Sequence, residues 1–336
     1  MSNSQRPIIV LGAANVGDTK VDKLAKYDTP EEVKTFLDTF YEHGGRHLDT
    51  ARNYSPSAPG SSEPRLGAVD AGSRFNIDTK IFGLPGDGPF HNAQQVMASI
   101  DASVADLKLP KDVKIDIMYL HLPDRETPFE ETCAAINQAY QEGKFKRFGI
   151  SNYTADEVEQ IVAICKEKGY VAPTVYQGQY NPIVRGGEES LFPVLRKHGI
   201  AFYAYSPAAA GVFVGNQKAA KTGSRFDNSL TRDQHKVGQL YLSLYSKPKI
   251  AIAADHTTEV AAKHGINGHA AALRWTTYHG TLDRSKGDAV IIGASSSTQL
   301  AANLDIIDQG PMPQEVVEVL DGVYGQLGEE AIAYHL

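Results

Sequence analysis

The stretch IDIMYLHLPDRETPFEETCAAINQAYQEGKFKRFGIS, residues 115–151, sets the pattern from which the fold follows. An apolar, β-branched run at 115–121 precedes a longer segment of helical period that opens at Thr127, and a second apolar run follows at 146–151. Strands separated by helices of this length are typical of parallel sheets with crossover helices. The stretch therefore predicts one strand–helix–strand unit of an α/β protein.

The same alternation extends over the rest of the chain, and eight strand–helix pairs can be distinguished. The predicted strands cover residues 8–13, 47–50, 75–81, 115–121, 146–151, 174–178, 201–206 and 289–294. Eight such pairs could close into a barrel or lie in an open, doubly wound sheet, and the alternation alone does not choose between them.

The position of the polar residues favours the barrel. Side chains that can carry chemistry lie at or near the carboxyl ends of different strands: Asp49, Lys80, His121, Ser151, Asn152, Gln177, Ser206 and Ser295–Ser297. In an open sheet, strands far from the switch point would not aim at one crevice, whereas the carboxyl ends of a barrel surround a single mouth. We therefore expect a (β/α)8 TIM barrel.

Helix starts and ends are marked in the sequence. Thr29, Thr127 and Thr154 each stand three residues before a glutamate, which is the pattern of a capping box. Glycines near the predicted helix ends suit left-handed caps. Two helices show apolar residues at helical spacing, and the residues expected on their buried faces are Val33, Phe36, Leu37 and Phe40, and Val96, Ile100, Val104 and Leu107.

Two insertions interrupt the alternation, at 55–67 and at about 210–250, and both follow predicted strands. Long loops at the carboxyl face of a barrel are where substrate contacts are expected. An apolar pattern at 312–330 predicts an extra C-terminal helix packed on the barrel. Although 336 residues could make two domains, a barrel of this size is common, so residues 1–336 are expected to form one domain.

The composition argues against several classes of function. The chain has 33 Lys and Arg against 40 Asp and Glu, a net charge of −7, so a general affinity for nucleic acid or an acidic membrane is not expected. Its two cysteines, Cys133 and Cys165, lie in apolar-periodic stretches and have no CxxC spacing, so neither a disulfide framework nor a zinc cluster is supported. The N-terminal residues do not resemble a signal peptide, and no apolar run is long enough to span a bilayer, so a cytoplasmic protein is expected.

Four ionisable residues are expected at the barrel mouth: Asp49, Tyr54, Lys80 and His121. A carboxylate beside a lysine keeps the ammonium charged, and that ammonium would stabilise a phenolate, lowering the tyrosine pKa toward the range of an acid/base catalyst. Each residue alone has an ordinary structural interpretation. Together at one mouth they indicate proton delivery to a carbonyl oxygen.

With these four residues and the blocks around them, the sequence resembles the aldo-keto reductases, and among them the aflatoxin-aldehyde and succinic-semialdehyde reductase branch. The matching blocks cover almost the whole chain in the family's order: HLDTARNY (47–54), IDTK (77–80), DIMYLHLPD (116–124), EGKFKRFGISNY (142–153), PTVYQGQYN (173–181), ESLFPVLRKHGIAFYAYSP (189–207), AALRW (271–275) and GDAVIIGASSSTQLAANL (287–304). The resemblance implies that Tyr54 is the general acid, that Lys80 and Asp49 tune it, and that His121 orients the substrate carbonyl.

The resemblance also implies a nicotinamide cofactor across the barrel mouth, without the Gly-x-Gly-x-x-Gly of a Rossmann fold. It assigns the carboxamide clamp to Ser151, Asn152 and Gln177, and nicotinamide stacking to Tyr205, next to Ser206. The adenosine-phosphate contacts are expected from Gly293, Ser295, Ser296, Gln299 and Asn303, where a loop enters a helix N-terminus.

The choice of cofactor rests on this last loop. Many aldo-keto reductases carry a lysine and an arginine there for the 2′-phosphate of NADPH (NADP+), but residues 291–303 contain no cation. The resembled branch has a serine-rich loop and still uses NADPH, so NADPH is expected ahead of NADH. Lys218, Lys221 or Arg225 could supply the charge.

A small-molecule carbonyl compound is the expected substrate. Arg52 and Arg225 are candidates to receive a substrate carboxylate. The tail at 332–336 and the element at 206–211 depart from the branch, so a preference for acidic semialdehydes is not implied. The resemblance also suggests a homodimer.

Two other functions compete with an NADPH-dependent reductase. Potassium-channel beta subunits share the fold and the tetrad but act mainly through a partner, so the chain could be a cofactor-binding regulatory subunit with little turnover. A hydrolase or metal enzyme has less support, because no G-x-S-x-G element or clustered His and carboxylate spacing is found and no metal is expected.

Overall fold

Eight parallel strands form a closed barrel. Each strand pairs with the next along the chain, and β8 pairs with β1 to close the sheet. The strands are β1 (Ile8–Gly12), β2 (His47–Asp49), β3 (Asn76–Ile81), β4 (Ile115–Leu120), β5 (Phe145–Ser151), β6 (Pro173–Gln179), β7 (Ala201–Tyr205) and β8 (Ala289–Ile292). The predicted TIM barrel is therefore confirmed, and every predicted strand lies within two residues of its observed bounds.

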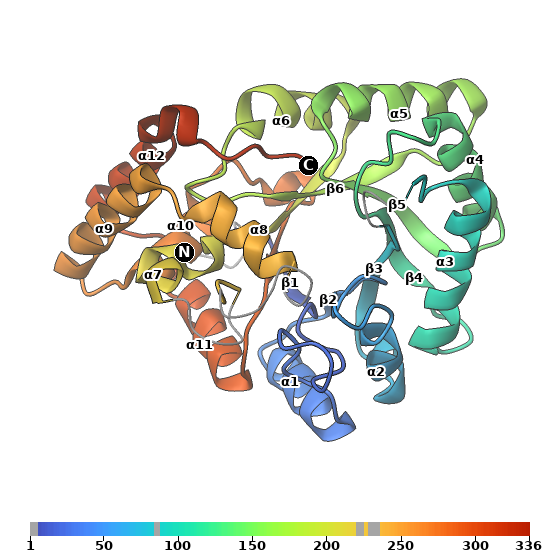
Figure 1. Cartoon of the computed structure of the whole chain (residues 1–336), viewed down its shortest axis with the longest axis horizontal. Helices are drawn as coiled ribbons and strands as arrows, with labels where there is room; N and C mark the ends of the chain where they lie inside the picture. The colour runs from blue at the N-terminus through green and yellow to red at the C-terminus, as the bar shows by residue number, and fades with distance from the viewer. Residues whose placement is uncertain (1–5, 84–87, 220–224, 228–235) are drawn as a thin grey trace.

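Helices surround this barrel (Figure 1). The computed structural model describes residues 6–83, 88–219, 225–227 and 236–336. Its helices are α1 (Pro30–Glu42), α2 (Ser62–Ala68), α3 (Ala93–Leu107), α4 (Phe129–Gln141), α5 (Ala155–Lys168), α6 (Gly187–His198), α7 (Asn216–Ala219), α8 (Lys236–Tyr245), α9 (Pro248–Lys263), α10 (Gly268–Tyr278), α11 (Ser297–Asp308) and α12 (Gln314–Leu327). The predicted C-terminal helix is α12, which packs along α9.

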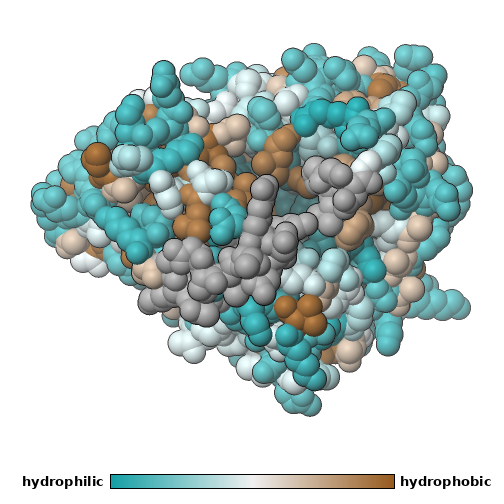
Figure 2. All heavy atoms as spheres, in the orientation of Figure 1, coloured by the Kyte–Doolittle hydropathy of each residue, from teal (hydrophilic) through white to brown (hydrophobic). Residues whose placement is uncertain are grey.

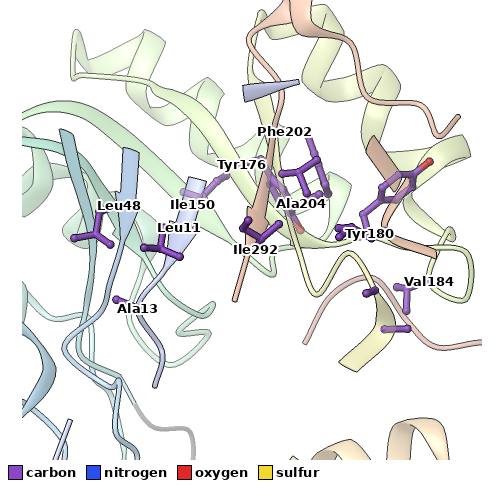
Figure 3. Packing of buried hydrophobic residues seen from close by; sticks show 14 of the residues in the cluster. Leu11, Ala13, Leu48, Ile150, Tyr176, Tyr180, Val184, Phe202, Ala204 and Ile292 are labelled. Atoms are coloured by element: carbon purple, nitrogen blue, oxygen red, sulfur yellow. The ribbon is translucent and has the colours of Figure 1, made fainter. Parts of the chain in front are cut away.

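The buried side chains form two layers. The larger layer lies between the strands and the helices; Leu11, Leu48 and Ile292 belong to it and are seen at close range in Figure 3. A smaller cluster fills the inside of the barrel, with Val10 and Tyr203 among its members. Strand side chains point alternately to the two layers, because successive residues of a strand face opposite sides of a sheet.

Two of the three predicted capping boxes are present. The hydroxyls of Thr29 and Thr154 each accept the backbone N–H three residues on, and the glutamate there returns the bond. The third prediction is wrong: Pro128 is the N-cap of α4, and the Thr127 hydroxyl donates to Asp124 at 2.6 Å. Because this hydroxyl is bound to a carboxylate three residues upstream, it does not cap the helix, and the helix begins one residue later than predicted.

The predicted buried face of α1 is confirmed, and that of α3 is correct except at one position. Val96, Ile100 and Leu107 are buried, but Val104 is 41% exposed and Ser103 is buried in its place. Positions 96, 100, 103 and 107 follow the helical period, whereas 104 has rotated past the edge of the packed face.

The face of the molecule that Figure 2 shows is largely polar. In Figure 2 most of the visible face is hydrophilic, and hydrophobic residues occur in small separate groups. Within the described parts of the chain, none of the helices combines the length and the apolar character needed to cross a membrane.

Candidate active site

The four residues predicted to carry acid/base chemistry meet at the carboxyl end of β2, β3 and β4. Asp49 is the last residue of β2, Lys80 is the fifth residue of β3, and His121 directly follows β4. Tyr54 comes from the loop after β2 and is partly buried. The structure thus brings the predicted tetrad together.

Hydrogen bonds fix three members of the tetrad. The buried Lys80 ammonium donates to both Asp49 oxygens at 2.8 and 2.7 Å, to the Thr50 carbonyl at 2.8 Å and to the Tyr54 hydroxyl at 2.9 Å. Tyr54 in turn donates its hydroxyl hydrogen to Asp49 at 2.9 Å. The phenol oxygen is therefore placed by a cation on one side and a carboxylate on the other.

His121 completes the group from the other side. Its ring stands edge-on to Tyr54, with 6.0 Å between the ring centroids, and its backbone carbonyl accepts a hydrogen bond from Asn152 at 3.0 Å. Its Nδ1 is buried and has no hydrogen-bond partner in the described structure. The imidazole is held in place by packing and by its backbone.

The electrostatics differ from the sequence-based prediction in one respect. Burial raises the pKa of Tyr54 well above its ordinary value and the Asp49 carboxylate adds to the rise, so the predicted lowering is wrong for the protein without ligands. Burial also lowers the pKa of Lys80, and burial together with the Lys80 charge lowers the pKa of His121 well below its ordinary value. Removal from water therefore keeps Tyr54 protonated beside the ammonium, and removal from water together with the ammonium keeps His121 neutral at neutral pH.

The predicted carboxamide clamp is linked to the tetrad. Gln177 donates to Asp49 at 2.8 Å. Asn152 adopts a left-handed backbone conformation (φ 69°), donates to the Ser151 hydroxyl at 3.0 Å and accepts from the Tyr205 hydroxyl at 2.8 Å. Because asparagine tolerates this conformation better than most residues, the backbone turns its amide toward the mouth without prohibitive strain.

Two tyrosines of α8 line the site beside Ser206 and Gln179, and sequence reasoning missed them. The Tyr241 hydroxyl lies 3.2 Å from that of Ser206 and accepts from Arg225 at 2.6 Å, while Tyr245 accepts from Gln179 at 2.5 Å. Arg225 is close enough to Tyr54 for its charge to oppose part of the rise in the tyrosine pKa. An aromatic residue in an amphipathic helix carries no sequence signal that distinguishes a site wall from a core.

The predicted phosphate loop enters α11 as expected. Ser296 caps this helix by accepting from the Gln299 backbone at 3.1 Å, and Ser295 donates through its backbone and its hydroxyl to the Gln299 side chain, both at 2.8 Å. Asn303 donates to the Gly293 carbonyl at 3.3 Å. A side chain at Gly293 would project into open space, so the backbone there is accessible to a ligand.

A cavity of about 440 Å³ adjoins this loop. Its walls are Lys26, Tyr27, Glu31, Glu32, Thr35 and Ser295–Ser297. Sequence reasoning missed Lys26, because this lysine lies about 270 residues from the serine loop and reaches it only through closure of the barrel between β8 and β1.

The other predicted cations are placed differently. Arg52 is paired at 2.5 Å with both Glu63 and Asp106, so its guanidinium is already engaged within the protein. Lys218 pairs with Asp255 at 2.7 Å, and Lys221 lies outside the described residues. Over the described ranges, no three His, Cys, Asp or Glu side chains are grouped in a way that could hold a metal ion.

Comparison with known proteins agrees with this geometry. Residues 8–324 match the profile described as the aldo/keto reductase family. The chain is 38% identical over 334 residues to oxidoreductase sirO of Leptosphaeria maculans, covering 98% of this chain and 97% of the relative. It is 36% identical to human aflatoxin B1 aldehyde reductase member 2, covering 97% and 88%, and 35% identical to human aldo-keto reductase family 7 member A3, covering 98% and 97%.

Proposed function

Because the chain belongs to the aldo/keto reductase family, in which oxidoreductase chemistry acts on carbonyl groups, we propose that it reduces small aldehydes or ketones to alcohols with NADPH. Tyr54 is the proton donor in this proposal. The observation that carries it is the Tyr54 hydroxyl, bonded to Lys80 and Asp49 and facing a neutral His121 at the barrel mouth.

Tyr54 and Lys80 have complementary roles in the proton transfer. The raised pKa of Tyr54, caused first by burial, keeps the phenol protonated until a carbonyl oxygen accepts its proton. The Lys80 ammonium, 2.9 Å from the phenol oxygen, then stabilises the phenolate that forms. For delivery, the phenol hydrogen rotates away from Asp49 toward the substrate.

His121 orients the substrate. Since burial lowers its pKa well below the ordinary value, the ring is uncharged and offers an N–H to the carbonyl oxygen without adding a second positive charge to the mouth. A hydrogen bond from His121 and one from Tyr54 fix the plane of the carbonyl group, and so expose one face of its carbon.

Residues on the opposite side of the mouth fit a nicotinamide cofactor, which when bound supplies a hydride to the carbonyl carbon from its C4 position. Gln177 uses its amide nitrogen on Asp49, so its oxygen is the atom available to a carboxamide N–H. Ser151 accepts from Asn152 and retains its hydroxyl hydrogen for a carboxamide oxygen. The Tyr205 ring is aligned beside them by its bond to Asn152.

The preference for NADPH over NADH is supported by the cavity next to Ser295–Ser297. Backbone N–H groups at the N-terminus of α11 favour a phosphate, and Lys26 places a cation on the facing wall. Glu32 of the same wall already accepts the backbone N–H groups of Asp28 and Thr29. We therefore assign the 2′-phosphate to this loop, with Lys26 as its counter-charge.

The proposal extends to the whole protein in three respects. Residues 1–336 would act as one domain, in the cytoplasm, and, on the ground of the family resemblance, as a homodimer. Light scattering on the purified protein measures the last of these directly.

Loss of NADPH absorbance with 4-nitrobenzaldehyde tests the proposed function. Turnover is expected for the wild type, and Tyr54→Phe is expected to reduce kcat by about 10²- to 10⁴-fold while cofactor affinity changes little, because the substitution removes the proton donor and almost no volume. Equal turnover by both proteins would rule out Tyr54 as the donor. Tight cofactor binding without turnover by the wild type would point instead to a regulatory subunit.

A further inference from the structure

Asp78 is a carboxyl inside the barrel that the proposed mechanism does not use. It pairs in register with Asp49 of the neighbouring strand β2 and precedes Lys80 by two residues on β3. Since alternate strand residues share a face, all three side chains point into the barrel. Asp78 is fully buried, and neither of its oxygens has a hydrogen-bond partner in the described structure.

The cations near Asp78 are engaged elsewhere. Lys80 above it binds Asp49, and Arg147 of β5 donates to Asp116 of β4 at 2.5 Å. Two other titratable groups interact with it electrostatically, Tyr119 on β4 and Tyr203 on β7, and His47 stands two residues before Asp49 on β2. Asp78 therefore lies between two ion pairs and has no counter-ion of its own.

Two carboxyls side by side in a buried site cannot both carry a charge at low cost. Asp49 accepts hydrogen bonds from Lys80, Tyr54 and Gln177. Asp78 accepts none. Burial raises the pKa of Asp78 well above its ordinary value, and the charges of Asp116 and Asp49 raise it further.

We infer that Asp78 is a positioning residue for the proposed reaction. As an uncharged acid it allows Lys80 to pair with the Asp49 carboxylate alone, and when it ionises it opposes formation of the Tyr54 phenolate. This inference rests on the proposed function. The ionised form would place a second negative charge below Lys80, and that charge would offset the ammonium that stabilises the phenolate. Reduction then slows at the pH at which Asp78 loses its proton.

The pH dependence of kcat for wild type, Asp78→Asn and Asp78→Leu tests this role. The three proteins are expected to turn over at similar rates near neutral pH. Both variants are expected to keep their rate to higher pH than the wild type. The kcat of the wild type is expected to fall about tenfold per pH unit above the pH at which Asp78 ionises. A merely structural Asp78 would alter expression or stability and leave the alkaline limb in place. Superimposable alkaline limbs would overturn the inference; if the leucine variant does not fold, the asparagine variant alone decides.

A readout without turnover separates failure of this inference from failure of the proposed function. Unfolded Asp78 ionises above about pH 4 while the folded form keeps its proton, so stability contributed by the protonated form is lost as pH rises toward the folded pKa. Relative to Asp78→Asn, the folding equilibrium constant of the wild type should therefore fall in urea titrations by about tenfold per pH unit above about pH 5, for as long as the folded form keeps its proton. A constant ratio would show that Asp78 is ionised in the folded protein and would overturn the inference whether or not the protein is a reductase.

Discussion

The half of the candidate site carried by β2, β3 and β4 differs from the half carried by β7 and β8. In the first half, Lys80 and Asp49 belong to strands, are buried, and have multiple hydrogen bonds to one another and to Tyr54. In the second half, Arg225 and Ser295 are exposed side chains on loops. On the proposed function, the groups assigned to proton transfer are organised before a ligand binds, whereas part of the proposed cofactor and substrate contacts come from loops, which tolerate change.

Among the substitutions compared in this section, Lys80→Met should have the largest effect, because Lys80 is hydrogen-bonded to both Asp49 and Tyr54 in the half of the site carried by β2, β3 and β4. We expect a loss of about 10²-fold or more in kcat and a fall of about 3 kcal/mol in the free energy of unfolding, because a buried Asp49 carboxylate is left unpaired. Steady-state kinetics and urea denaturation measure the two effects.

The double variant Lys80→Met, Asp49→Asn separates these effects. It should recover much of the stability, since no buried charge is left alone, while kcat stays low because the phenolate still lacks its cation. Recovery of kcat with stability would show that Lys80 acts only through folding.

Asn152→Ala tests the link between the two halves. It removes the bonds to Ser151, Tyr205 and the His121 carbonyl and places alanine at a positive φ. We expect cofactor affinity to fall by about tenfold, with a smaller change in kcat, because the clamp loses its orientation and the equivalent of about one hydrogen bond to the cofactor, about 1 kcal/mol, is lost. Fluorescence titration with NADPH measures the affinity.

The matched control is Tyr205→Phe, which loses one of these bonds and keeps the ring. Its cofactor affinity should lie between those of wild type and Asn152→Ala. An unchanged affinity for Asn152→Ala would contradict the assignment of the clamp.

Lys26→Gln should have the smallest effect, because it alters one partly exposed contact on the wall that faces the Ser295–Ser297 loop. We expect the preference for NADPH over NADH to fall by about fivefold, since partly exposed ion pairs contribute about 1 kcal/mol. Comparison of kcat/KM for the two cofactors measures this change. Lys23→Gln is the control, because Lys23 is exposed nearby and does not line the cavity; equal effects of both variants would remove Lys26 from the site.

The barrel and the tetrad could be predicted from sequence, because the spacing of apolar residues marks the strands and helices, and the position of polar residues at strand ends marks the site. Strand bounds follow from runs of apolar residues, and the carboxyl ends of parallel strands meet at one mouth wherever they lie in the chain. Tyr54 and Lys80, 26 residues apart, are therefore predicted neighbours.

What could not be predicted depends on burial and on distant partners. The pKa of Tyr54 moves up because the phenol is removed from water, and no local pattern reports that depth. Arg52 looked free to bind an anion, but one of its partners, Asp106, lies 54 residues away. Asp78 is an ordinary polar residue in the sequence and becomes unusual only when closure of the barrel encloses it.

Direct transfer of deuterium tests the central claim most directly. The wild type would be mixed in a single turnover with 4-nitrobenzaldehyde and NADPH deuterated at the transferring C4 position, and the alcohol product would be analysed by mass spectrometry and NMR. Deuterium on the carbinol carbon, formed by wild type and strongly reduced with Tyr54→Phe, is the predicted result. Alcohol without deuterium, or bound cofactor with no alcohol formed, would contradict the assignment of this chain as a carbonyl reductase.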